Sequence, residues 1–196
     1  GAEVGYRIER DEDLVLSLAY FWLQSDSELI FAGDSGATEA SDGSERSGLE
    51  LALFWELNSN WVLDLTGSIV DSKFVAVDAK SDHIPNAHGR VISMGLTRAP
   101  VLGWNWSMRV RHFGDAALVE DDSINYPSTT IINMGLSYKT DRWTAGVDLF
   151  NLADSEHYDI AYWYSSRLLS EVSPVEDIHF HPVNPRSIRV GLEYRF

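Results

Sequence analysis

Segments in which apolar and polar residues alternate make up most of this chain, and their period constrains the fold more than any other feature. In Leu14–Trp22 and in Leu49–Leu57, every second residue is apolar. A period of two is typical of a β-strand with one apolar face, whereas a helix needs a period near 3.6. We expect about nine such strands. They lie around residues 4–8, 14–22, 49–57, 61–65, 92–96, 104–110, 132–138, 143–149 and 188–196.

The links between these strands alternate in length without exception. Short links at residues 11–13, 58–60, 99–103 and 140–142 alternate with long links at residues 33–47, 75–90, 114–128 and 154–185. Strands that run up and down place successive links at opposite ends, so the short turns share one rim and the long loops share the other. This asymmetry is typical of outer-membrane barrels, whose turns are periplasmic and whose loops are extracellular. The prediction is an all-β fold, an antiparallel up-and-down transmembrane β-barrel.

An odd number of strands predicts that the chain holds only part of a barrel. The first and ninth strands of an all-antiparallel sheet run parallel, so they cannot pair to close it. An open edge in lipid leaves backbone groups unpaired, at a cost of several kcal/mol each. The chain also begins at Gly1 without an initiator Met or a leader. We therefore expect residues 1–196 to be the C-terminal portion of one larger barrel domain, with further strands upstream.

Composition excludes several other classes of protein. The net charge is −15 and only three lysines occur, which argues against a nucleic-acid partner. No apolar run is long enough for a transmembrane helix, and the absence of cysteine excludes a disulfide scaffold or a thiolate metal site. No Ser/His/Asp set or Gly-rich phosphate loop has a convincing context, so we predict that the chain is not an enzyme. Acidic residues gather in the long loops, where they solvate the surface or attract cations.

Aromatic residues sit near the strand ends on the apolar face. Rings at this level suit the headgroup region of a bilayer, which makes membrane lipid an expected partner. Two other interpretations remain open. The first is a soluble β-sandwich binding module, which would bury the same rings as a core. The second is a small outer-membrane barrel that acts as an adhesin or a surface enzyme.

Four glycines inside strands are expected to relieve crowding on the polar face or to mark bulges. They are Gly67, Gly95, Gly135 and Gly146.

The last long loop carries the best candidates for ligand binding. Four aromatic residues, Tyr158, Tyr162, Trp163 and Tyr164, are followed by Arg167. Flat rings and a guanidinium group can hold a planar, anionic or hydroxylated small molecule by stacking and charge-assisted hydrogen bonds. The alternative is that these rings pack the loop onto the rim. A loop of this length is usually functional or disordered.

A speculative metal site lies further along the same loop. His179 and His181 stand two residues apart, on the same side of an extended chain, and Asp177 precedes them. Imidazole and carboxylate groups are common ligands of divalent metals, but a third histidine would have to join this pair. The available residues are His83, His88, His112 and His157. The alternatives are that the pair forms hydrogen bonds that fix the loop or that it contacts an organic ligand.

Four short motifs occur in one order along the chain: EVGYR, RSGLELAL, VDLFNLADSEHYD and GLEYRF. They resemble, in turn, two charged and glycine-containing strands, the Asn-Leu-x-Asp…Tyr segment and the C-terminal strand of TonB-dependent outer-membrane receptors. The chain departs from that pattern at Ala153, where an aromatic residue is common, and in the spacing from Asp154 to Tyr158. These departures affect the subfamily and leave the family resemblance intact.

The resemblance implies a barrel of about 22 strands around a plugged lumen, in the outer membrane of a Gram-negative bacterium. Such receptors take up scarce nutrients, most often ferric siderophores or other metal chelates. The chelate is cargo, so no cofactor is expected. Energy comes from the TonB complex through an N-terminal plug domain that has no counterpart in this chain. Tyr194 and Phe196 resemble the C-terminal signal that the barrel assembly machinery reads.

Overall fold

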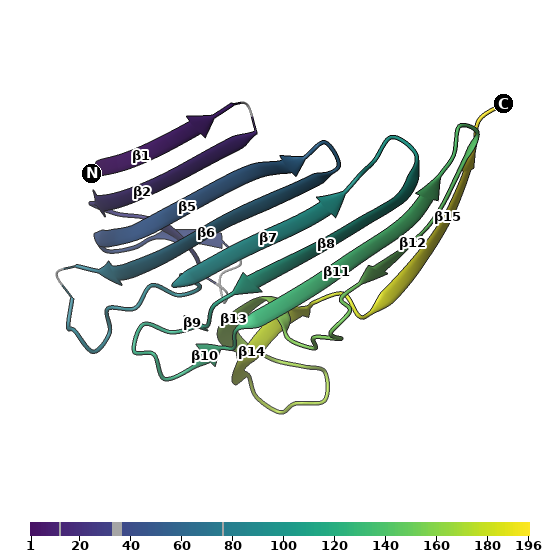
Figure 1. The fold of residues 1–196 in the computed structure, drawn as a ribbon. Coiled ribbons are helices and arrows are strands. Elements are labelled where there is room, and N and C mark those ends of the chain that lie inside the picture. The colour runs from purple at the N-terminus through teal and green to yellow at the C-terminus, as the bar shows by residue number, and fades with distance from the viewer. Residues whose placement is uncertain (12, 33–36, 76) are drawn as a thin grey trace.

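The computed structural model describes residues 1–11, 13–32, 37–75 and 77–196, and these residues form strands joined by turns and loops (Figure 1). Nine long strands make one sheet: β1 (Ala2–Arg10), β2 (Leu14–Ser25), β5 (Ser44–Asn58), β6 (Trp61–Phe74), β7 (Arg90–Arg98), β8 (Gly103–Phe113), β11 (Thr129–Lys139), β12 (Trp143–Phe150) and β15 (Ser187–Tyr194). None of the described residues belongs to a helix long and apolar enough to cross a membrane.

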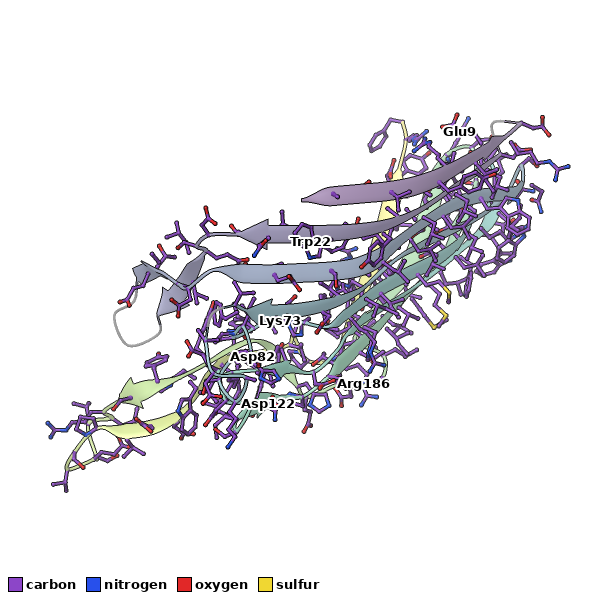
Figure 2. All side chains as sticks on the ribbon, turned by 90° about the vertical axis from the view of Figure 1, so that its left-hand side faces the viewer. Glu9, Trp22, Lys73, Asp82, Asp122 and Arg186 are labelled. Carbon is purple, nitrogen blue, oxygen red and sulfur yellow. The ribbon has the colours of Figure 1, made fainter. Side chains whose placement is uncertain are left out.

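Six further strands form three hairpins outside this sheet. They are β3 (Leu29–Ala32) with β4 (Ala37–Ala40), β9 (Ala116–Ala117) with β10 (Asn125–Tyr126), and β13 (Tyr158–Ser166) with β14 (Val175–Pro182). All three hairpins lie in the long links, at one end of the sheet (Figure 1). In Figure 2, Lys73, Asp82 and Asp122 lie toward this end, whereas Glu9 lies toward the other. We call the two ends the loop rim and the turn rim.

The strand order of the large sheet follows the order of the chain. Every strand pairs antiparallel with its predecessor and its successor among the nine, from β1 at one edge to β15 at the other. The prediction of about nine up-and-down strands is therefore confirmed. β1 and β15 do not pair with each other among the described residues, so the sheet is open, as expected for part of a larger barrel.

The register keeps the predicted apolar residues on one face across all nine strands. Leu18 stands between Tyr6 and Leu51, and Val147 stands between Leu136 and Val190. Leu51 and Val147 are half-buried. The other four side chains are exposed, and Val190 keeps 79% of its surface accessible. A continuous apolar face of this extent would drive association in water, and no second layer of the described residues covers it. The face suits lipid contact, and the arrangement is not that of a β-sandwich.

The first long loop differs from its predicted bounds of 33–47. β2 continues to Ser25 and β5 begins at Ser44, so the loop comprises residues 26–43 and contains the β3–β4 hairpin. The residues that extend β5 are polar, and Ser44–Ser47 pair with Asp71–Phe74 of β6. A strand that continues beyond an apolar layer into water no longer needs an apolar face, so its end lacks the alternation on which the prediction relied.

Candidate functional site

The third and fourth long loops share a small hydrophobic core, which contains several of the most buried residues of the described chain. Ala116, Leu118 and Tyr126 of the third loop meet Ala161 of β13, which has no accessible surface. Side chains at its margin are Ile124, Tyr158, Trp163 and Ile178. Burial of apolar side chains contributes roughly 25 cal/mol per Å², so the β9–β10 and β13–β14 hairpins stabilise each other.

Tyr126 is the main polar link between these two loops. Its hydroxyl group donates a hydrogen bond of 2.5 Å to the backbone oxygen of Tyr158, and the two rings stack with centroids 5.9 Å apart. Burial raises the pKa of Tyr126, and the negative charge of Asp159 raises it further. His88 extends the link to the second loop, because its ring lies 5.1 Å from that of Tyr126 and its Nδ1 is 2.7 Å from the Gly114 oxygen.

Asn151 fixes the base of the fourth loop and explains one of the four sequence motifs. Its buried side-chain amide donates hydrogen bonds to the backbone oxygens of Ser155 and Asn184, at 2.9 and 3.0 Å. Its side-chain oxygen accepts one from the Ser155 amide at 2.9 Å. The residue has a φ of 48°, a conformation that asparagine adopts more readily than most residues. Asn151 thus joins both ends of a loop whose termini are far apart in the sequence.

Asp154 makes a second connection across the same base. Its carboxylate accepts hydrogen bonds from the backbone amide and the guanidinium group of Arg186, at 3.2 and 3.0 Å. The Asn-Leu-x-Asp motif therefore holds the start and the end of the fourth loop together, and this positions the hairpin that the loop carries.

All four long loops line one cleft of about 620 Å³ at the loop rim. Three of the predicted ligand-binding residues, Tyr162, Trp163 and Tyr164, lie along its side on β13. The first loop contributes most of the opposite wall. The other lining residues are Ile30, Glu39, Ala40, Ser41, Asp42, Phe74, Pro85, Asn86, Leu118, Glu120, Ser165 and Glu176.

The cleft is acidic as well as aromatic. Four carboxylates, Glu39, Asp42, Glu120 and Glu176, line it, and its described lining holds no lysine or arginine. Glu120, Glu176 and Trp163 also border an adjoining, more open hollow of about 630 Å³. A cleft with charges of one sign raises the local concentration of ligands of the opposite sign, so this surface attracts cations and repels polyanions.

Two of the predicted ligand-binding residues lie outside the cleft. Tyr158 belongs to the small core between the loops, where its ring lies 4.2 Å from that of Phe180. Arg167 stands at the tip of the β13–β14 hairpin, and its Nε donates a hydrogen bond of 3.0 Å to the Glu171 backbone oxygen. Tyr158 therefore packs between the loops, and Arg167 contacts its own loop, so ligand binding by these two residues remains a prediction.

The geometry lends no support to the predicted metal site. His179 stacks on Tyr164 with ring centroids 3.7 Å apart. Its Nε2 is 2.6 Å from the Ser166 hydroxyl and its Nδ1 is 3.0 Å from the backbone oxygen of Asp177, while His181 lies 3.6 Å from Asp159. No group of three or more possible ligands gathers anywhere in the described part of the chain. Metal binding by His179, His181 and Asp177 remains a prediction.

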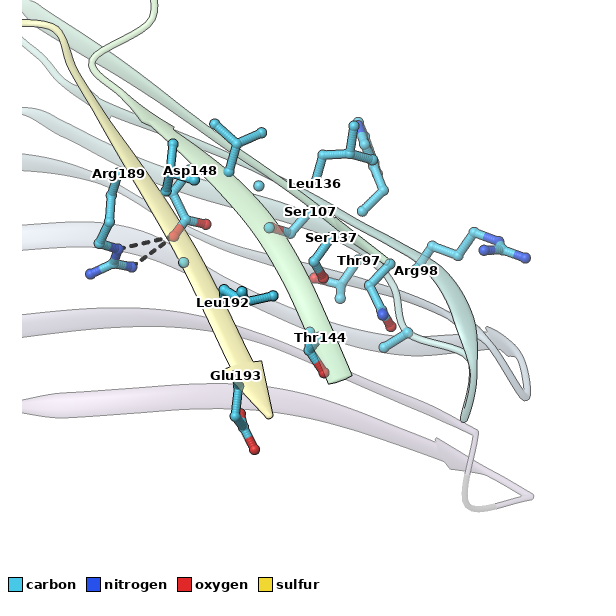
Figure 3. A pocket seen from close by; sticks show the side chains of 18 residues that line it. Thr97, Arg98, Ser107, Leu136, Ser137, Thr144, Asp148, Arg189, Leu192 and Glu193 are labelled. Carbon is cyan, nitrogen blue, oxygen red and sulfur yellow. Dashed lines mark hydrogen bonds and ion pairs between the residues drawn. The ribbon is translucent and has the colours of Figure 1, made fainter. Parts of the chain in front are cut away.

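The polar face of the sheet carries a second, shallower hollow of about 520 Å³ (Figure 3). Small polar side chains line it, among them Thr97, Ser107 and Ser137. At its edge Asp148 accepts two hydrogen bonds from Arg189, at 2.9 and 3.0 Å, which Figure 3 draws as dashed lines. In a barrel whose apolar face meets lipid, this face is the wall of the lumen.

A further ion pair on the polar face explains one of the strand glycines. Asp64 binds Arg109 through two hydrogen bonds of 2.9 Å, and a Cβ atom on Gly95 would lie only 2.3 Å from the Asp64 carboxylate. Gly67 was expected on the same face, but its partners Leu51 and Ile92 place it on the apolar face. The expectation was wrong for Gly67 because β6 continues past Leu65, and its period of two places Gly67 in the same row as Leu63 and Leu65.

The sequence analysis missed the contribution of Pro85, Asn86 and Leu118 to the cleft. These residues come from two loops that show no motif of their own. The available signal was topological, because four long links at one rim are expected to meet. The acidic residues of the loops were recognised as a group, and four of them now line one site.

An open sheet with an apolar outer face, tight turns at one rim and structured loops at the other defines part of an outer-membrane β-barrel. The chain belongs to the TonB-dependent receptor family, since residues 1–152 match the family model described as TonB dependent receptor-like, beta-barrel. Members of this family are transporters in the outer membrane of Gram-negative bacteria and not enzymes, which confirms the predicted class and location.

Several solved receptors share the fold. The ferric yersiniabactin uptake receptor FyuA from Yersinia pestis superimposes with a TM-score of 0.73 at 18% identity, over 99% of this chain and 29% of that receptor. The siderophore receptor PiuA from Acinetobacter baumannii has a TM-score of 0.73 at 16% identity, over 98% of this chain and 28% of its own. The copper transporter OprC has a TM-score of 0.64 at 15% identity, over 99% of this chain and 30% of its own. This chain thus spans about three tenths of the length of these receptors.

Proposed function

We propose that these residues are the C-terminal part of a TonB-dependent receptor that takes up a small metal chelate, with ferric siderophores as the leading class. The cleft formed by all four long loops is the observation that carries this proposal. In outer-membrane barrels the long loops face the outside of the cell, so the cleft would meet a nutrient before it enters the lumen. The names of the similar structures, which include ferric siderophore receptors and a copper transporter, support the same substrate class.

The charge of the cleft favours chelates that are neutral or positively charged. Two unit charges 4 Å apart interact by about 4 kcal/mol at an effective dielectric constant of 20. A polyanionic chelate would face Glu39, Asp42, Glu120 and Glu176 without a compensating cation in the described lining. A neutral or cationic chelate would gain from these carboxylates and from the aromatic wall. The selectivity for charge follows from the residues of this chain alone.

Each part of the cleft has a distinct role in this proposal. Tyr162, Trp163 and Tyr164 present rings for stacking on a flat or apolar part of the chelate. The carboxylates draw a cationic ligand toward the mouth. Uptake would use energy from the TonB complex, transmitted through a plug domain, as in other members of the family. The partners therefore proposed are a small-molecule ligand and TonB.

The test uses the full-length receptor in detergent and measures the binding of two chelates of one metal, one cationic and one anionic, by tryptophan fluorescence. We expect the cationic chelate to bind more tightly, and Trp163→Ala to weaken it by about tenfold, which corresponds to about 1.4 kcal/mol. Glu120→Gln together with Glu176→Gln should reduce the preference for positive charge.

Arg167→Gln is the matched control, because Arg167 lies in the same loop but outside the cleft. It should bind both chelates as the unchanged receptor does. Equal loss in the Arg167 and Trp163 variants would contradict the assignment of the cleft. A preference for the anionic chelate would contradict the charge argument and would leave the family assignment untouched.

A further inference from the structure

The turn between β7 and β8 differs in composition from the other three turns at the turn rim. Its residues 99–102 are Ala-Pro-Val-Leu, whereas the other turns are built from aspartate, glutamate, asparagine, serine, threonine and arginine. Val101 is 83% exposed and Leu102 is 46% exposed. Burial of aliphatic side chains away from water is favourable, so this turn suits the membrane interface better than the three polar turns do.

Arg98, the last residue of β7, is a cation on the apolar face, as Arg10 is at the end of β1. Its register partners are Trp61 on β6 and Trp106 on β8, and both belong to the row of apolar side chains. The guanidinium Nη1 donates a hydrogen bond to the backbone oxygen of Trp104. Arg98 is among the residues that border the hollow of Figure 3, and there its side chain points away from Asp148 and Arg189. No carboxylate among the described residues forms an ion pair with Arg98.

Aromatic rings surround this arginine at the turn rim. Trp61 and Trp106 lie with ring centroids 5.9 Å apart, and Trp104 contacts Tyr138 at 5.1 Å. Trp104 is 56% exposed. Indole rings at a strand end mark the level of lipid headgroups, and Arg side chains near that level direct their charge to the interface. The arginine therefore lies at the depth of phosphate groups, with aliphatic side chains beside it.

We propose that Arg98 binds the phosphate group of a phospholipid in the periplasmic leaflet, within a frame formed by Trp61, Trp104 and Trp106. The planar guanidinium group matches the geometry of a phosphate and forms charge-assisted hydrogen bonds with it. Val101 and Leu102, in the turn that follows Arg98, extend the apolar surface of the frame at the membrane interface. The site is continuous with the lipid-facing side of the sheet and does not depend on the cargo of the receptor.

The test measures lipid binding to the full-length receptor in detergent by native mass spectrometry. The probes are phosphatidylglycerol, a diacylglycerol with the same acyl chains, and inorganic phosphate. Arg98→Gln should weaken phosphatidylglycerol binding by about tenfold and leave diacylglycerol binding unchanged. Arg10→Gln is the matched control, because Arg10 lies on the same face at the turn rim but opposite Leu14, outside the tryptophan frame. It should bind phosphatidylglycerol as the unchanged receptor does.

Three results would overturn the proposal. Equal losses in the Arg98 and Arg10 variants would show a nonspecific charge effect, and inorganic phosphate that competes as well as the lipid would show a simple anion site. The third result would show that the turn contacts a periplasmic protein in water instead of lipid, and a spin label on the turn distinguishes the two. A nitroxide label on a Val101→Cys variant in lipid nanodiscs should be accessible to oxygen and shielded from a water-soluble nickel chelate. The opposite accessibility would place the turn in water. Unchanged cargo binding in all variants verifies that they are folded.

Discussion

At the scale of single residues, the polar face of the sheet depends on positions where even one methyl group would collide with an ion pair. Gly95 lies directly beneath Asp64 and Arg109, and a Cβ there would approach the Arg109 guanidinium to 2.5 Å. The clashing groups are the ends of two flexible side chains, so a Cβ atom at Gly95 would force the ion pair to shift. The absent side chain at Gly95 therefore leaves room for the pair in the position that it occupies.

Gly95→Ala should destabilise the receptor by about 1–3 kcal/mol, the usual effect of overpacking. The measurement is denaturant unfolding of the full-length receptor in lipid vesicles. Gly191→Ala provides the control, because Gly191 lies on the same face and a Cβ there meets nothing within 4 Å among the described residues. Similar losses of stability in the two variants would show that the ion pair does not require the glycine.

A second single-residue effect concerns pH and the base of the first long loop. The Glu28 carboxylate accepts hydrogen bonds from Arg46, at 2.6 and 3.0 Å, and from the Ser44 hydroxyl. The hydrogen bond from Arg46 is the main cause that lowers the pKa of Glu28. A carboxylate whose pKa is lowered by folding stabilises the folded state at pH values above its pKa in the unfolded chain, about 4.3. This stabilisation is lost as the pH falls through its pKa in the folded state.

We expect the first loop to loosen as the pH falls below the ordinary glutamate pKa and through the lowered pKa of Glu28, and Glu28→Gln to remove most of this dependence. The mobility of a spin label on a Thr38→Cys variant, in β4, reports the change. Asp26→Asn in the same loop leaves the Glu28–Arg46 pair intact and should keep the full pH response. An unchanged response in the Glu28 variant would rule out this carboxylate as the cause.

At the scale of elements, the β9–β10 and β13–β14 hairpins behave as one unit. They share a buried core and the hydrogen bond from Tyr126 to the backbone of Tyr158. The raised pKa of Tyr126 means that the contact is fully present below the ordinary tyrosine pKa near 10 and is lost as the pH rises through the folded value. The wall of the cleft that carries Trp163 is thereby attached to the third loop.

Tyr126→Phe should keep the ring packing and lose the hydrogen bond, which is worth about 1 kcal/mol. Faster hydrogen exchange in both hairpins at once is the expected result, since the two are coupled. Tyr6→Phe, a change on the exposed apolar face of β1, serves as the control. Faster exchange in only one hairpin would show that the loops move independently.

At the scale of the whole molecule, the last strand forms one edge of the sheet and precedes the proposed assembly signal. β15 ends at Tyr194, and the ring of Phe196 contacts that of Tyr194 with centroids 5.1 Å apart. Phe196 lies one residue beyond the strand pairing, because the Arg195 amide still donates a hydrogen bond to the Arg142 oxygen. Both rings lie at the turn rim, where the aromatic residues of the apolar face gather.

Phe196→Ser should reduce the amount of folded receptor in the outer membrane more than Leu136→Ser does. The Leu136 substitution removes only the transfer free energy of one lipid-facing side chain. The Phe196 substitution would also weaken recognition of the receptor by the assembly machinery. The measurement is the fraction of heat-modifiable receptor in isolated outer membranes. Equal reductions would count against Tyr194 and Phe196 as an assembly signal.

The sequence by itself determined the nine strands of the large sheet, their direction and the face that their large side chains occupy. These features depend on local periodicity and on the lengths of links, both of which can be read along the chain. The second, third and fourth long links and all four short turns lie where the alternation ended, within a few residues. Prediction was weaker at Ser44, where β5 leaves the apolar layer and the period disappears.

Only the tertiary structure decided which loop residues meet. The aromatic run of the last loop looked uniform in sequence, but Tyr162, Trp163 and Tyr164 line the cleft whereas Tyr158 is in the core between loops and Arg167 is at the hairpin tip. Contacts between residues far apart in the chain set these positions, and no periodicity records them. The physical reason is that a barrel wall repeats one local pattern, while its loops are held by packing that is different at every residue.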